Sequence, residues 1–111
     1  MAYDQELANR VEAVLTETSP AAFVGKKMFG GVGYMVNGNM ACGVIKDGLI
    51  VRLGKGAYSA ALKEPGAAEF DMTGRPITGW VKVDASVLKD EEMMWYWVRK
   101  GLDFALDLPE K

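Results

Sequence analysis

Few residues of this sequence have the types and spacing that catalysis requires. The chain contains no histidine, which excludes Ser-His and Cys-His nucleophile pairs and histidine-based zinc sites. Cys42 is its only cysteine and has neither a neighbouring base nor a second thiol, so we interpret it as a buried, inert side chain. The sequence therefore predicts a protein that is not an enzyme and uses no metal or cofactor.

The glycine-rich segment FGGVG at residues 29–33 is similar to a nucleotide-binding loop in composition only. A dinucleotide fingerprint needs a strand before the glycines and a helix directly after them, whereas a hairpin pattern follows here. The chain also lacks the Gly-Lys-Ser/Thr triplet of a P-loop. We interpret the segment's glycines, together with a further one, as structural residues within strands: Gly30, Gly31, Gly33 and Gly43.

Two groups of carboxylates could serve acid/base catalysis or bind a metal. Glu69 and Asp71 lie two residues apart in an extended segment, and Asp90, Glu91 and Glu92 begin an apolar periodic segment. Acidic residues are common at the first turn of a helix because they interact favourably with its dipole. We interpret both groups as structural.

Helical periodicity occurs in three segments. Asp4 is expected to cap a first helix that ends between Thr16 and Pro20, and a short helix is expected at about residues 57–63, where Pro65 stops it. Asp90 is expected to begin the longest helix, of roughly 18 residues and about 27 Å.

The remaining pattern is that of strands. The tight-turn pairs Asn37-Gly38 and Asp47-Gly48 predict three antiparallel strands within residues 26–53. Further strands are expected at residues 69–71 and 79–83, with a loop at 73–76 between them. The predicted fold is one α+β domain over residues 1–111: a two-layer sandwich in the order α-β3-α-β2-α, with an antiparallel sheet and helices on one face.

A sheet covered by helices on one side leaves its other face for solvent, a ligand or a partner. If Val81 and Val83 point toward the helices, alternation places Trp80 and Lys82 on the opposite face. The same argument places Arg52 there. With neighbouring cations they form a candidate basic and aromatic binding surface for anionic or planar ligands: Lys26, Lys27, Arg52, Arg75, Trp80 and Lys82. The alternative is a solvated face on which a loop or a second copy covers Trp80.

The charge is distributed unevenly along the chain. Residues 1–25 hold one basic and four acidic side chains, residues 26–82 eight basic and four acidic, and residues 83–111 four basic and seven acidic. The basic middle indicates either a surface for anions or acidic helices that complement a basic sheet. A pI of about 5.1 disfavours direct DNA binding, because phosphate contacts require concentrated positive charge.

Localisation follows from what the sequence lacks. The first residues show no signal-peptide pattern, no apolar run approaches the length of a membrane span, and a single cysteine fits a reducing compartment. We expect a cytoplasmic protein without membrane association.

Five segments resemble the N-terminal domain of the bacterial TfoX/Sxy family: MAYDQEL at residues 1–7, KMFGG at 27–31, MVNG at 35–38, FDMTGRP at 70–76 and GWV at 79–81. The resemblance implies a two-layer fold similar to that of secretion chaperones. Full-length TfoX proteins regulate natural competence and carry a second, helical domain. Because the sequence ends at Lys111, we expect a stand-alone N-terminal domain. The family offers no catalytic residues to carry over.

The predicted function is a non-catalytic regulatory or protein-interaction module of this type, linked to competence or transcription regulation. It would bind a protein partner, or a second copy as a homodimer, through the open sheet face or the flank of the last helix. The alternative is a small-ligand or nucleic-acid binding domain that uses the basic and aromatic residues named above.

Overall fold

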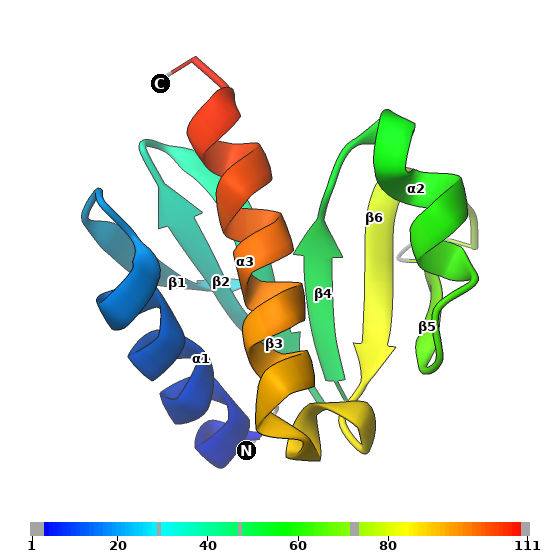
Figure 1. Ribbon diagram of the computed structural model, residues 1–111, viewed down its shortest axis with the longest axis horizontal. Coiled ribbons are helices and arrows are strands. Elements are labelled where there is room, and N and C mark those ends of the chain that lie inside the picture. The colour runs from blue at the N-terminus through cyan, green and yellow to red at the C-terminus, as the bar shows by residue number, and fades with distance from the viewer. Residues whose placement is uncertain (1–3, 29, 47, 72–73, 110–111) are drawn as a thin grey trace.

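The computed structural model describes residues 4–28, 30–46, 48–71 and 74–109 (Figure 1). Its elements, in chain order, are α1 (Gln5–Thr18), β1 (Phe23–Met28), β2 (Gly31–Val36), β3 (Asn39–Ile45), β4 (Gly48–Arg52), α2 (Lys55–Leu62), β5 (Ala67–Asp71), β6 (Pro76–Asp84), the 3-10 helix η1 (Val87–Lys89) and α3 (Glu91–Asp107). No helix in these ranges is both long and apolar enough to cross a membrane.

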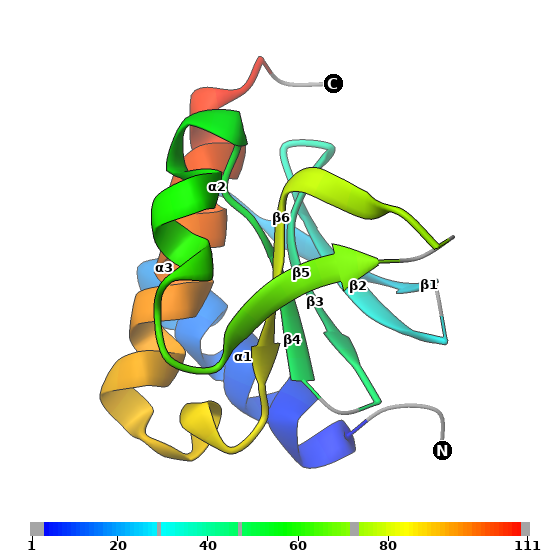
Figure 2. The same cartoon turned by 90° about the vertical axis from the view of Figure 1, so that its right-hand side faces the viewer.

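The six strands form one antiparallel sheet in the order β1-β2-β3-β4-β6-β5. All three α-helices pack on the same face, so that one layer of helices covers one layer of sheet (Figure 2). The predicted α+β class, the antiparallel sheet and the single helical face are therefore confirmed. The likeness to secretion chaperones remains a prediction.

The predicted order α-β3-α-β2-α is wrong by one strand, because four strands precede α2. The missed strand is β1, which pairs only with β2 and whose residues Val24 to Lys27 are all exposed. An exposed edge strand needs no alternation of apolar and polar residues, so the hydrophobic pattern of residues 23–28 did not predict a strand. Gly30, predicted within a strand, instead lies between β1 and β2 with a φ of 74°.

The turn between β2 and β3 is as predicted. Asn37 and Gly38 have φ values of 53° and 81°, the positive values that a type I′ turn requires at both central positions. In the second predicted turn Gly48 begins β4, whereas Asp47 lies outside the described residues. Phe29 and Thr73, which belong to the predicted glycine-rich segment and loop, also lie outside them.

Local hydrogen bonds explain where the two long helices begin. The Asp4 carboxylate accepts from the Leu7 backbone N–H at 3.1 Å, and the Asp90 carboxylate accepts from the N–H groups of Glu92 and Met93 at 2.9 and 3.4 Å. Each acid satisfies donors that have no partner within the helix. This confirms the prediction that Asp90 begins the longest helix.

The main core lies between the sheet and the helices. Val81 and Val83 are fully buried in it, and the Tyr34 hydroxyl connects the sheet to α1 by donating toward Glu12 Oε2 at 2.9 Å and Ala8 O at 3.3 Å. Cys42 is also fully buried, and burial raises the pKa of its thiol to about 12. The thiol is therefore protonated at neutral pH, which agrees with the prediction of a buried, inert cysteine.

Candidate functional site: the helix-free face of the sheet

The face of the sheet opposite the helices carries a second apolar cluster, separate from the main core. Met40, Ile50 and Phe70 are its buried members, with exposed fractions of 8, 1 and 7%. Four partly buried side chains pack around them: Met35, Ile45, Ile77 and Trp80.

The edge strand extends this cluster to the margin of the sheet. Val24 of β1 is paired with Met35 and is 57% exposed. Each of the six strands thus contributes at least one apolar side chain to a continuous surface, which we call the apolar band: Val24, Met35, Met40, Ile45, Ile50, Phe70, Ile77 and Trp80.

A bend in β6 brings part of that strand over the face. Gly79 has a φ of 97°, and its carbonyl accepts from the N–H groups of both Leu53 and Gly54, at 2.9 and 3.1 Å. This backbone conformation is readily accessible only to glycine. Beyond the bend, the β5–β6 hairpin projects on the helix-free side (Figure 2), and Ile77 packs on the second cluster.

Arg52 and Trp80 are neighbours on β4 and β6, as the predicted alternation requires. The Arg52 guanidinium carbon lies 5.7 Å from the centre of the Trp80 ring and 5.4 Å from that of Phe104 on α3. Both distances are within the range of a cation–π interaction. Arg52 is therefore held against two aromatic rings at the margin between the sheet face and the helical layer.

Lys82 and Lys26 also lie on the helix-free face. Lys82 is paired with Ile50, and Lys26 with Gly33. Four interstrand spacings separate the two lysines in the strand order, a path of about 19 Å along the sheet. Cations this far apart along the sheet do not form one compact anion site.

The other two predicted residues are Lys27 and Arg75. Lys27 is paired with Val32, which packs against the main core, so alternation places Lys27 on the helical side. Arg75 is exposed just before β6. The fold therefore brings together Arg52, Trp80 and Lys82 and places Lys26 on the same face, whereas Lys27 lies on the other face and Arg75 is exposed on the β5–β6 hairpin. The roles of all six predicted residues in binding remain a prediction.

The apolar band was not among the features predicted from the sequence. A signal for it exists, because residues 40–45 and 49–51 are apolar or glycine without interruption. A strand that is apolar at successive positions is covered on both faces, whereas one open to water alternates. The uninterrupted runs of β3 and β4 thus indicated that the helix-free face was not a plain solvated surface.

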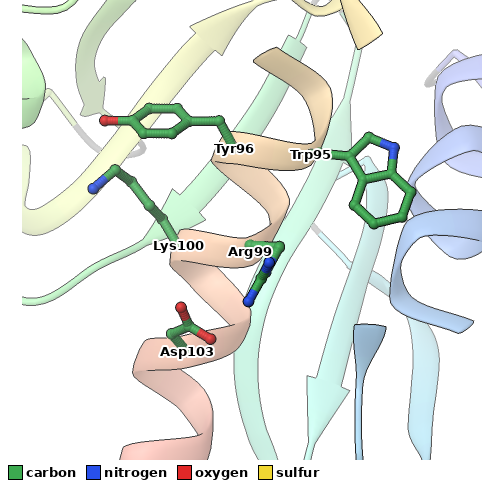
Figure 3. A pocket seen from close by; sticks show the side chains of 5 residues that line it. All are labelled: Trp95, Tyr96, Arg99, Lys100 and Asp103. Atoms are coloured by element: carbon green, nitrogen blue, oxygen red, sulfur yellow. The ribbon is translucent and has the colours of Figure 1, made fainter. Parts of the chain in front are cut away.

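A second surface lies on the outer side of α3, where five side chains surround a shallow depression (Figure 3): Trp95, Tyr96, Arg99, Lys100 and Asp103. Tyr96 donates a hydrogen bond of 2.7 Å to Glu64 Oε2, and Lys100 Nζ lies 4.8 Å from the centre of the Tyr96 ring. Burial, together with the hydrogen bond and charge of Glu64, raises the pKa of Tyr96 to about 12. Its hydroxyl remains a donor at neutral pH.

The fold and the face define an α+β domain whose single antiparallel sheet has helices on one side and an apolar band on the other. Residues 19–105 match the family model of the TfoX N-terminal domain, and the chain belongs to this family. The resemblance found in the sequence is thereby confirmed. No curated protein matches the chain.

Proposed function

We propose that this chain is a non-catalytic regulatory module that binds a protein partner through the helix-free face of its sheet. The observation that carries the proposal is the apolar band, which crosses all six strands on a face that no helix covers. Membership of the TfoX N-terminal family supports a role in the regulation of competence or transcription.

The exposure of the band favours an interaction surface. Val24 is 57% exposed, and Met35, Ile45, Ile77 and Trp80 are each partly accessible. Contiguous apolar surface with a polar margin is typical of sites that bind other molecules. Aromatic, methionine and arginine side chains, all present here, are enriched in protein–protein interfaces.

The charges at the margin of the band indicate the kind of partner. Lys26, Arg52 and Lys82 are the basic residues of this face, and about 19 Å of sheet separates the outer two. An extended or helical protein segment with apolar and acidic side chains matches that spacing, whereas a small anion cannot reach Lys26 and Lys82 together. A second copy that docked face to face would bring like charges together.

One observation favours a second candidate function, the binding of a small planar anion or of single-stranded nucleic acid. The Arg52 guanidinium lies within cation–π distance of Trp80 and Phe104, and a guanidinium fixed beside an aromatic ring can recognise phosphate or a base. This function would use one end of the band and not its whole length.

The test is to place a photo-crosslinking amino acid at position 24 and, in a matched control, at position 27. Both positions are exposed on β1 and point to opposite faces of the sheet. We expect reproducible crosslinks to a protein in cell extract from position 24 only, and we expect Lys26→Glu, but not Lys27→Glu, to weaken them. Crosslinks of equal yield from both positions, or none from either, would show that the helix-free face is not the interaction surface.

The second candidate is tested separately. Binding of nucleotides or oligonucleotides at low salt should change the emission of Trp80, which a Trp80→Phe variant identifies. A change in Trp80 emission without protein crosslinks would favour ligand binding over the proposed protein interaction.

A further inference from the structure

The outward side of α3 presents a stripe of exposed residues, of which Tyr96 extends sideways to its hydrogen bond with Glu64 (Figure 3). Its four members are spaced at i, i+4, i+7 and i+11, which places them along one side of a helix: Glu92, Tyr96, Arg99 and Asp103. The opposite side of α3 is buried in the main core. The half-buried ring of Trp95 lies beside the stripe and points toward α1 (Figure 3).

Within the stripe, Glu92 and Arg99 carry opposite charges and lie two turns of helix apart. Trp95 borders one shallow depression together with Glu91 and Glu92, and a second one together with Arg99 and Lys100. Within the described residues, neither Glu92 nor Arg99 forms an ion pair. An acidic group and a basic group are therefore available on either side of an aromatic centre.

From this pattern we propose that a second copy of the chain binds here, with the two α3 helices antiparallel and a two-fold axis passing between Trp95 and Tyr96. Glu92 and Arg99 lie equally far from that point, about 5 Å along the helix in opposite directions. The two-fold axis therefore places each Glu92 opposite Arg99 of the other copy. Two equivalent ion pairs result, as in any isologous interface.

The charges also select the antiparallel arrangement over the parallel one. Parallel α3 helices would place Glu92 opposite Glu92 and Arg99 opposite Arg99, and like charges opposed in this way repel each other. In the antiparallel arrangement the two Trp95 rings lie on one side of the contact and the two Tyr96 rings on the other. Aromatic side chains near the centre of an interface commonly supply most of its binding energy.

This dimer is independent of the proposed function. Helix α3 lies on one side of the sheet and the helix-free face on the other (Figure 2), so dimerisation through the outer side of α3 leaves both helix-free faces accessible. A dimer would present two such faces to a partner, and two linked sites bind a divalent partner more tightly than one site does.

Charge exchange tests the proposal. Glu92→Arg alone, or Arg99→Glu alone, converts both ion pairs of the homodimer into repulsions, so each single variant should dimerise at least about tenfold more weakly at low salt. The Glu92→Arg/Arg99→Glu double variant restores both pairs with the charges exchanged and should dimerise within about threefold of the original chain. Sedimentation equilibrium over a range of concentrations gives these constants.

Mixing the two single variants gives a sharper result. Two copies of the same single variant repel each other, whereas the charges of the two different variants are complementary. Native mass spectrometry should therefore find heterodimers well above their statistical share. Thermal melts of all variants check that the fold is intact, since both positions are exposed. An original chain that stays monomeric at all concentrations, single variants that dimerise normally, or a double variant that does not recover would each overturn the proposal.

Discussion

At Gly101 the backbone of α3 lies directly against β3, and replacing this glycine with alanine gives the sharpest test of the packing. A Cβ atom at this position would overlap the carbonyl oxygen of Ala41 and lie 3.0 Å from the carbonyl carbon and 3.3 Å from Val51 Cγ1. Because the overlap is with the backbone of β3, no side-chain rotation relieves it. The helix would have to move away from the sheet.

The expected change in the free energy of unfolding of Gly101→Ala follows from two opposing effects. Alanine is favoured over glycine within a helix by about 1 kcal/mol, whereas forcing an extra carbon into a packed core costs about 1 to 3 kcal/mol. The backbone overlap places Gly101→Ala at or beyond the upper end of that cost. We expect a net loss of about 2 kcal/mol in the free energy of unfolding, and a Tm lower by roughly 8 °C.

Gly56→Ala in α2 is the matched control. An added Cβ at this exposed position meets no atom within 4 Å, so only the helix propensity changes, and a gain of about 0.5 kcal/mol is expected near the start of the helix. Urea denaturation followed by circular dichroism measures both variants. If Gly101→Ala were as stable as the original chain while Gly56→Ala gained stability, the close contact between α3 and β3 would be refuted.

Three further measurements address individual side chains. Asp90→Ala removes the acceptor of two N–H groups at the start of α3 and should lower the free energy of unfolding by about 1 kcal/mol in urea denaturation; Asp90→Asn should lose less, and equal losses would contradict a capping role. The Cys42 thiol, with its pKa raised to about 12, should not react with a thiol reagent at neutral pH until the chain unfolds, and rapid reaction of the native protein would show that it is accessible. Tyr96 should ionise near pH 12, as followed by phenolate absorbance against Tyr96→Phe, and Glu64→Gln should lower this pKa. Because folding raises the pKa of Tyr96, its contribution to stability is complete below pH 10 and is lost as the pH rises toward 12. A free energy of unfolding that stays constant between pH 10 and 12 would contradict the raised pKa.

The parts of the fold that the sequence predicted are those with local signals. The Asn37-Gly38 turn and the Asp90 cap depend only on residues close to them in the chain, and both are observed. Alternation along β6 correctly assigned Trp80 and Val81 to opposite faces of the sheet.

The unpredicted features depend on contacts between distant segments. Phe70 and Met40 meet only because β6 bends at Gly79 and brings the β5–β6 hairpin over the sheet. Single-sequence patterns identify the glycine but not the direction of the bend. For the same reason the six predicted binding residues could not be sorted by face before the strand register was known, and Lys27 was grouped with Lys26.

The position of β1 at the edge of the sheet has a consequence for solubility. Its outer side offers backbone N–H and C=O groups to which a strand of another molecule could add, which is the first step of many aggregation processes. Lys26 and Lys27 are adjacent, so their side chains leave this edge in opposite directions, one above the sheet and one below it. An approaching strand therefore meets a positive charge on either side. We therefore expect Lys26 and Lys27 to oppose edge-to-edge association of this protein in concentrated solution.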